Sequence, residues 1–174
     1  MARNVEIKAR IDSVAALEPQ VARLADSGPT PIAQDDTFFR CAAGRLKLRE
    51  FADGSAELIA YDRADRTGPK VSTYQRVPVA DPAPLRAALA AACGVLGRVR
   101  KQRRLYLIGA TRVHLDEVEG LGPFLELEVV LTDAQTAAEG VALARHLLEA
   151  LGTGADRLVA GAYLDLLAAK DLPP

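Results

Sequence analysis

The sequence has only two cysteines among 174 residues and no long apolar run, and each shortage excludes a class of protein. Cys41 and Cys93 lack the paired spacing of a metal motif, so we expect thiols that pack in the fold. The apolar stretch over 158–167 is interrupted by Gly161 and Asp165 and is too short to span a bilayer. We therefore expect a protein that does not cross a membrane.

The sequence also has no excess of charge of either sign. The formal net charge is -1, which argues against nonspecific nucleic-acid binding because such binding depends on a strong basic excess. The N-terminus has no apolar segment followed by a small-residue cleavage site, so we expect a cytoplasmic protein. With 49% hydrophobic and 26% charged residues and no low-complexity run, the composition indicates one globular domain over 1–174. Any site for an anion must then be a local cluster of charge.

Alternation of polar and apolar residues predicts about eight antiparallel strands, because side chains two apart lie on one face of a strand. The expected strands cover 3–11, 36–40, 45–51, 57–63, 70–79, 97–108, 111–118 and 123–131. The run Gly28-Pro29-Thr30-Pro31 is typical of a turn, and we expect one before the second strand.

Four helices are expected from capping residues and apolar periodicity. The first follows Asp12 or Ser13 and runs to about Asp26, and the second covers 82–93 and ends at Gly94. Asp133 is expected to cap the third, and the fourth begins near Asp156 and stops before Pro173. Strands with separate helices predict an α+β fold.

Several strands carry pairs of like charges two residues apart. These pairs are Lys47 with Arg49, Lys101 with Arg103, and Glu126 with Glu128. A solvated strand face explains any one pair, but several together cost stability unless opposite charges or a polyvalent ligand neutralise them. The opposite faces are apolar and need a helical cover. We therefore expect a closed eight-stranded antiparallel β-barrel with helices packed outside and charged side chains lining an aqueous interior.

The types of charge suggest what such an interior binds. Three carboxylates, from Glu6, Glu126 and Glu128, suit a hard divalent cation such as Mg²⁺ or Mn²⁺, which often bridges to substrate phosphates. Basic side chains would neutralise phosphate oxygens through charge-assisted hydrogen bonds. The candidates are Lys8, Lys47, Arg49, Arg63, Lys101 and Arg103.

Four motifs, in this order along nearly the whole chain, support a family resemblance. They are Val5-Glu6-Ile7-Lys8, Lys101-Gln102-Arg103, His114-Leu115-Asp116 and Gly120-Leu121-Gly122-Pro123-Phe124-Leu125-Glu126-Leu127-Glu128. Together they resemble the CYTH superfamily, also called triphosphate tunnel metalloenzymes, which includes class IV adenylyl cyclases, thiamine triphosphatases and inorganic triphosphatases. The resemblance implies an eight-stranded tunnel in which basic residues grip a triphosphate beside one or two metal ions.

The resemblance also implies roles for individual residues. Glu6, Glu126 and Glu128 resemble metal ligands, and Asp116 is expected to help the metal or its water. The implied triphosphate contacts are Lys8, Lys47, Arg49, Lys101 and Arg103, to which the strand interpretation adds Arg63, Arg112 and, as a weaker candidate, Lys70. The expected catalytic residues are Glu6, Lys8 and Asp116.

One position departs from the family's Glu-x-Glu-x-Lys opening. Asn4 replaces the first glutamate and offers a neutral oxygen. Because carboxylate charge dominates the binding of hard cations, a second metal site should be weakened more than the first.

Three functions fit these motifs. The first is hydrolysis of inorganic triphosphate or of an organic or nucleoside triphosphate, and the second is conversion of ATP to cyclic AMP and pyrophosphate. The third is a non-catalytic polyphosphate or nucleotide binder. Action on triphosphorylated RNA ends is disfavoured because basic, aromatic-rich stretches are absent. A homodimer is compatible with helices on the outer surface.

Some other polar and aromatic residues have roles that the sequence leaves open. Tyr61, Ser72 and Tyr74 line the organic part of a substrate or only pack. We expect His114 to be supporting or exposed, His146 to lie on a helix surface, and Tyr163 to pack at the tunnel mouth or in the core.

Overall fold

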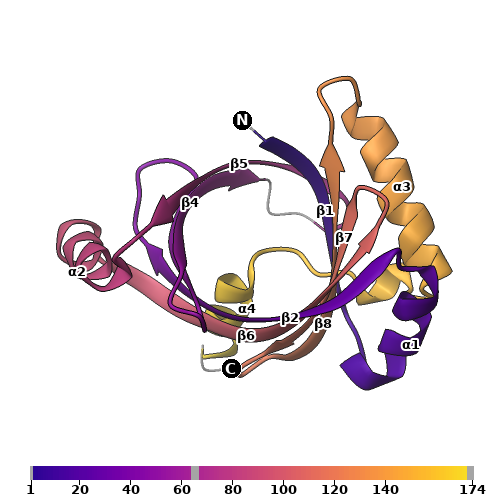
Figure 1. The fold of residues 1–174 in the computed structure, drawn as a ribbon, viewed down its shortest axis with the longest axis horizontal. Helices are drawn as coiled ribbons and strands as arrows, with labels where there is room; N and C mark the ends of the chain where they lie inside the picture. The colour runs from indigo at the N-terminus through magenta and orange to yellow at the C-terminus, as the bar shows by residue number, and fades with distance from the viewer. Residues whose placement is uncertain (1, 64–66, 172–174) are drawn as a thin grey trace.

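The computed structural model describes residues 2–63 and 67–171, and its centre is a closed barrel of antiparallel strands (Figure 1). The strand order around the barrel is β1-β5-β4-β3-β2-β6-β7-β8. The strands are β1 (Ala2–Arg10), β2 (Ser27–Phe39), β3 (Arg45–Phe51), β4 (Ala56–Arg63), β5 (Lys70–Val79), β6 (Val95–Ile108), β7 (Thr111–Val118) and β8 (Gly122–Leu131). The predicted fold class, an eight-stranded barrel with outer helices, is confirmed.

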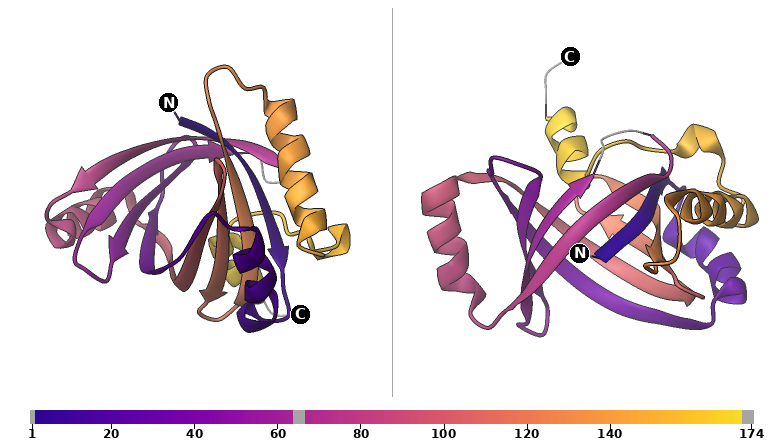
Figure 2. Two further views of the ribbon diagram at one scale, coloured as in Figure 1. Left: turned by 45° about the vertical axis from the view of Figure 1, so that its right-hand side comes forward. Right: turned by 90° about the horizontal axis from the view of Figure 1, so that it is seen from above.

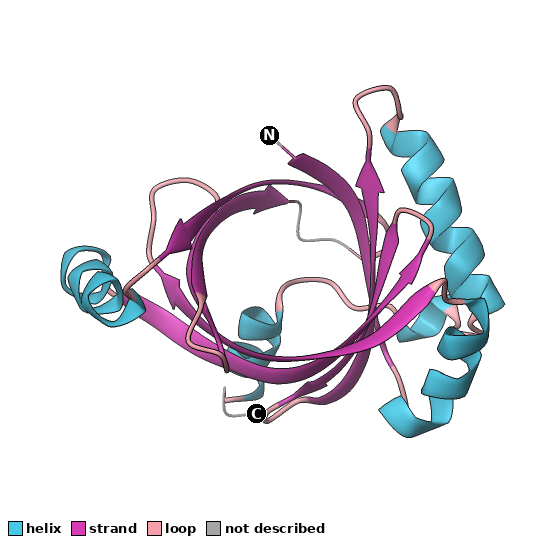
Figure 3. Cartoon of the chain, viewed as in Figure 1, coloured by secondary structure: helices cyan, strands magenta, loops and turns pink. Residues whose placement is uncertain are grey.

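Helices cover the outside of the ring of strands, and the last helix of the chain is drawn across the opening of the ring (Figure 3). They are α1 (Val14–Leu24), α2 (Pro82–Cys93), α3 (Ala137–Ala150) and α4 (Tyr163–Lys170), with a short 3₁₀ turn at Ala155–Arg157. Helices α1 and α3 cover the side formed by β1, β7 and β8, and α2 packs against β2 and β3. Helix α4 lies beyond one end of the barrel (Figure 2). None of these helices is long and apolar enough to cross a membrane.

The apolar strand faces point outward, as predicted. Val5, Ile7 and Ala9 of β1 are buried in one cluster with the inward faces of α1 and α3. A second cluster joins Leu48 of β3 to apolar residues of α2. Because neighbouring side chains on a strand point to opposite faces, this outer core directs the polar residues of the same strands into the barrel.

The expected turn at Gly28-Pro29-Thr30-Pro31 is wrong. These residues belong to β2, where the register against β6 shifts between Ser27 and Thr30. Proline donates no ladder hydrogen bond, and such a shift is where a strand tolerates it. At Gly28 φ is +113°, and an added Cβ would lie 2.7 Å from the Leu105 carbonyl oxygen, so this position requires glycine.

Two helix starts also differ from the expectation. Thr136, rather than Asp133, caps α3 and forms a reciprocal capping box with Glu139. The last helix begins at Tyr163 instead of near Asp156, because the 3₁₀ turn over Ala155–Arg157 is followed by extended chain that pairs with β1 at Leu158 and Val159. Leu158 forms an isolated β-bridge with Ala9 of β1. The two residues are far apart in the sequence, so local helix-start signals do not reveal this pairing.

Candidate functional site

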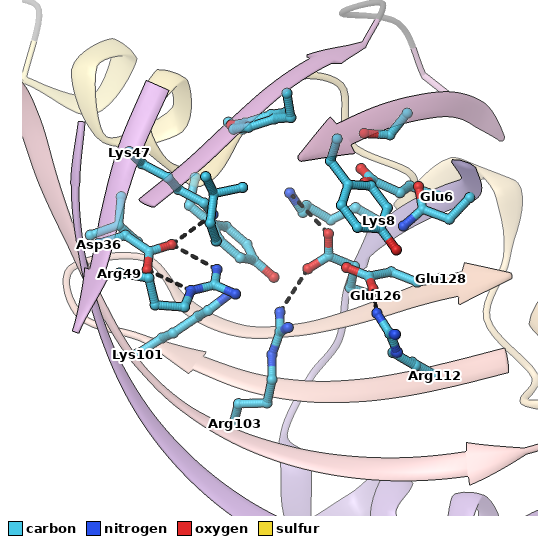
Figure 4. Close-up of a pocket in the computed structure, with 18 of the residues that line it drawn as sticks. Glu6, Lys8, Asp36, Lys47, Arg49, Lys101, Arg103, Arg112, Glu126 and Glu128 are labelled. Atoms are coloured by element: carbon cyan, nitrogen blue, oxygen red, sulfur yellow. Dashed lines mark hydrogen bonds and ion pairs between the residues drawn. The ribbon is translucent and has the colours of Figure 1, made fainter. Parts of the chain in front are cut away.

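A cavity of about 130 Å³ lies inside the barrel, and we call it the tunnel cavity (Figure 4). Among the described residues that line it, seven are basic and four are acidic, which leaves a net charge of +3 with every group ionised. The basic residues are Lys8, Lys47, Arg49, Arg76, Lys101, Arg103 and Arg112, and the acidic ones are Glu6, Asp36, Glu126 and Glu128. Such a lining suits a polyanion accompanied by a cation.

The strand register brings the three predicted carboxylates to one wall. Glu6 of β1 lies directly opposite Glu128 of β8, and Lys8 lies opposite Glu126. On the other side of β8, Glu128 faces Arg112 and Glu126 faces His114 of β7. Potential ligand atoms of His114, Glu126 and Glu128 all lie within 4.8 Å of one another. We call this cluster with Glu6 the carboxylate wall.

The carboxylate wall is electrostatically asymmetric. Burial favours a raised pKa for Glu126, but Lys8 and Arg103 outweigh it and hold that pKa well below its usual range. Arg103 Nη2 donates to Glu126 Oε2 at 2.9 Å, and Lys8 Nζ lies 3.9 Å from Oε1. Burial together with Glu126 and Glu6 raises the pKa of Glu128. An added cation would relieve this repulsion.

The chemistry of these donors fits a hard divalent cation, because all three carboxylates offer oxygen ligands. Asn4 adds a further oxygen at the same cavity. The residue is 2% exposed, and its Oδ1 has no hydrogen-bond partner in the described part of the chain. A buried carbonyl oxygen without a partner is costly unless a ligand or water satisfies it.

Asp116 lies behind the basic pair of β6 rather than among the residues that line the cavity. Its carboxylate accepts two hydrogen bonds from Arg103, from Nε and Nη2, each at 2.7 Å. Lys101 Nζ at 3.3 Å and the Tyr163 hydroxyl at 2.9 Å complete its partners. Burial raises the pKa of Asp116, but Arg103 and Lys101 hold it below the usual range. To hold a metal, Asp116 would have to exchange these partners.

A second acid–base cluster lies on β2 and β3. Asp36 accepts hydrogen bonds at 2.8 Å from Arg49 Nε and Nη2 and from Lys47 Nζ. Burial raises the pKa of Asp36, but Arg49 and Lys47 hold it far below the usual range. Sequence reasoning missed Asp36, although a strand register that placed it opposite Arg49 would have revealed it.

Burial also weakens the charge of two lysines. It lowers the pKa of Lys101 to about 7, with Arg103 as the next cause. It lowers the pKa of Lys47 to about 8, with Arg49 as the next cause and despite the attraction of Asp36. Two of the predicted phosphate contacts are therefore close to losing their protons near neutral pH.

Tyr163, at the start of α4, lines the cavity. Its ring packs edge-to-face on Phe124, with 5.0 Å between centroids. Lys8 Nζ lies 4.0 Å from the centroid of the Tyr163 ring, within cation–π range. Tyr163 is buried, as the core alternative expects, and its position at a tunnel mouth stays a prediction.

Of the remaining residues with a predicted position or role, some lie where we expect them and others do not. The exposed alternative for His114 is wrong, because its side chain is 3% exposed inside the barrel; burial and Arg103 hold its pKa well below the usual range. His146 is exposed on α3, as expected. Lys70 is buried but does not line the cavity, whereas Arg76, which sequence reasoning missed, does. The side chain of Arg63 lies outside the described residues.

Comparisons with known proteins agree with this architecture. The sequence profile of the CYTH domain matches residues 2–163. The chain is 34% identical over 68 residues to the MJ0240 protein of Methanocaldococcus jannaschii, provisionally named an adenylate cyclase, and this match covers 39% of each chain. The activity of that relative therefore does not transfer directly.

Solved structures show the same fold. The PH1012 protein of Pyrococcus horikoshii OT3 superposes with a TM-score of 0.84 at 21% identity, over 94% of this chain and 99% of that one. HpAC1 from Hippeastrum, named for adenylyl cyclase and described as having a dominant triphosphatase activity, gives a TM-score of 0.69 at 17% identity, over 100% and 98% of the two chains.

Proposed function

The chain belongs to the CYTH domain family, and from that premise we propose that it is a divalent-metal-dependent triphosphatase. The observation that carries the proposal is the tunnel cavity, in which a net positive lining surrounds a wall of three carboxylates. A triphosphate and a cation together complement that distribution of charge. The triphosphatase activity described for HpAC1, which has the same fold, supports hydrolysis.

Glu6, Glu126 and Glu128 would hold the cation, which we propose to be Mg²⁺ or Mn²⁺, with Asn4 as a neutral oxygen beside them. When bound, such a cation supplies Lewis-acid activation of a phosphoryl oxygen and orients the attacking water. Because Asn4 brings no charge, we propose one strongly bound cation rather than two.

The basic residues would hold the phosphate chain and stabilise the charge that develops as the phosphorus–oxygen bond breaks. Lys8 and Arg103 already lie beside Glu126 on the carboxylate wall, and Lys47 and Arg49 come from the opposite side of the cavity through β3. Arg112 reaches Glu128 at 3.4 Å. Lys101 completes the set of proposed triphosphate contacts, and Arg63 stays a prediction.

Among the residues expected to be catalytic, Glu6 and Lys8 line the cavity and could touch the substrate or the cation. Asp116 would act through its neighbours, because its hydrogen bonds fix the Arg103 guanidinium and the Lys101 ammonium group. We therefore propose Asp116 as a positioning residue whose charge offsets these two cations before a triphosphate binds.

A second candidate is adenylyl cyclase activity, which the name of the MJ0240 relative suggests. Tyr61 and Tyr74 form a cross-strand pair on β4 and β5, and both line the cavity. These rings could contact a nucleobase while the 3′-hydroxyl of ATP attacks its α-phosphorus and pyrophosphate leaves. Substrate specificity would then decide between hydrolysis and cyclisation in the same tunnel.

The test is incubation of the protein with Mg²⁺ or Mn²⁺ and, separately, inorganic triphosphate, ATP and thiamine triphosphate, with products resolved by chromatography. Orthophosphate supports the triphosphatase, and cyclic AMP with pyrophosphate supports the cyclase. Glu126→Gln should abolish either activity, whereas Glu119→Gln, on the surface with a 69% exposed side chain, should not. Metal-independent binding without any product would overturn both and favour the non-catalytic binder.

A further inference from the structure

His114 is a buried polar residue that the proposed mechanism does not use. It lies on β7 between Leu105 of β6 and Glu126 of β8. A ring nitrogen of His114 lies close enough to the oxygens of Glu126 and Glu128 to share a cation with them. The imidazole could therefore be a metal ligand, through a lone pair, or a hydrogen-bond donor that holds a carboxylate, through N–H.

Arg103 distinguishes these roles. Its Nη1 lies 3.4 Å from His114 Nε2. A guanidinium group has only donors, so Nε2 must offer its lone pair, and a neutral imidazole that accepts at Nε2 carries its proton on Nδ1. Arg103 is held in this orientation, because its Nε and Nη2 bind Asp116. Its Nη2 also reaches Glu126 (Figure 4).

The proton on Nδ1 then faces the carboxylate wall. Nδ1 is buried and has no hydrogen-bond partner in the described part of the chain. Glu128 Oε1 lies 3.9 Å from Nδ1, and a small side-chain rotation would bring the two atoms to the usual hydrogen-bond distance of about 2.9 Å. A protonated Nδ1 has no lone pair to offer a cation, whereas Glu128 Oε2, which accepts only a long 3.4 Å contact from Arg112, still has a lone pair for one.

We infer that His114 is a positioning residue whose Nδ1–H orients Glu128, and that the cation site is built from oxygen atoms without a nitrogen ligand. The claim about the cation site rests on the proposed function. The claim that His114 carries its proton on Nδ1 does not depend on it. An all-oxygen site favours Mg²⁺ or Mn²⁺, whereas an imidazole ligand would shift the preference toward Zn²⁺.

The tautomer can be measured directly, because the chain has only two histidines. In the His146→Gln variant, which changes an exposed residue of α3, His114 is the sole source of imidazole signals. Long-range proton–nitrogen correlation spectra of the ¹⁵N-labelled variant should show a neutral ring protonated on Nδ1, both without metal and with saturating Mg²⁺. Protonation on Nε2, or loss of the Nδ1 proton on addition of Mg²⁺, would overturn the inference.

Two substitutions test the positioning role by calorimetric titration with Mg²⁺. His114→Asn places an amide nitrogen near the position of Nδ1 and should keep the Mg²⁺ affinity within about threefold, whereas His114→Leu should lower it by about tenfold or more. Equal losses in both variants, with folding verified by circular dichroism, would contradict positioning through N–H. Absence of Mg²⁺ binding in the unsubstituted protein would instead reject the proposed function and leave the tautomer result standing.

Discussion

Asp36 and Arg49 face each other across β2 and β3, and the Asp36 carboxylate accepts both the Nε and the Nη2 hydrogen bonds of Arg49 at 2.8 Å. Lys47 shares the same carboxylate. One buried acid thus balances two partly buried cations before any ligand is present. A triphosphate that binds these cations must share them with Asp36.

Asp36→Asn should therefore destabilise the empty protein and increase its response to ligand. Removing one partner of a buried ion pair costs about 3–5 kcal/mol, which for a chain of this size lowers the melting temperature by roughly 10 °C. Inorganic triphosphate would supply the missing negative charge, so its stabilising effect in thermal denaturation should be larger in the variant than in the unsubstituted protein.

Asp35→Asn is the matched control, because Asp35 points outward and pairs with Arg98 and Arg100, whose side chains are 47% and 50% exposed. Surface ion pairs contribute about 0–1 kcal/mol, so this variant should melt close to the unsubstituted protein. Equal destabilisation of both variants, or an unchanged ligand response in Asp36→Asn, would contradict the compensating role of Asp36.

Glu128→Gln should weaken divalent-metal binding by roughly 100-fold, because it removes one of the few charged oxygens of the carboxylate wall. It should not weaken folding in the absence of metal, since burial, Glu126 and Glu6 already disfavour the ionised form of Glu128. Titration with Mn²⁺ followed by electron paramagnetic resonance measures the affinity. A variant that binds Mn²⁺ as tightly as Glu119→Gln would remove Glu128 from the proposed site.

Triphosphate binding in the absence of metal should weaken as the pH rises from 7 to 9. The pKa of Lys101 is about 7 and that of Lys47 about 8 in the empty cavity, and a bound polyanion favours the protonated amines. The complex then holds more protons than the free protein, so higher pH disfavours it by roughly tenfold or more over this range. Calorimetry in two buffers of different ionisation enthalpy should detect proton uptake.

Lys101→Arg tests the origin of this dependence, because a guanidinium stays charged and should reduce the pH dependence to the part that Lys47 contributes. As the pH rises, the triphosphate affinity of the unsubstituted protein should fall, whereas the folding stability of the empty protein should rise. Between pH 7 and 10 the unfolded chain, with ordinary lysine pKa values of 10.5, binds more protons than the folded one. The contribution of these two lysines to the free energy of unfolding therefore rises with pH. A pH-independent affinity in the unsubstituted protein would refute the assignment.

Tyr163→Phe should separate the two contacts that Tyr163 makes. It deletes the hydroxyl that donates to Asp116 but keeps the ring beside Phe124 and Lys8, so we expect a loss of about 1–2 kcal/mol. Tyr163→Leu removes the ring as well and should cost more, measured by urea denaturation. Similar losses in both variants would show that the ring contacts contribute little.

Much of the barrel could be predicted because strand alternation is a local property. The residues Val5 and Ile7 alternate with Glu6 and Lys8, and this pattern alone places charge opposite an apolar face. The boundaries of α2 were predicted for the same reason, since a proline start and a glycine end act within one turn of helix. Predicting β2 failed at its start, where the shifted register against β6 lets a proline-rich run join the sheet.

In the candidate site, too, some features follow from local sequence and others from tertiary structure. The alternation within β1 and β8 predicted Glu6, Lys8, Glu126 and Glu128 on inward faces, because the type and spacing of charged residues are properties of the local sequence. Only closure of the barrel and the return of α4 decided which charges meet, because Asp36 pairs with Arg49 from another strand and Tyr163 reaches Asp116 across 47 positions of sequence. Such contacts depend on register and packing between distant segments, and no local pattern encodes them.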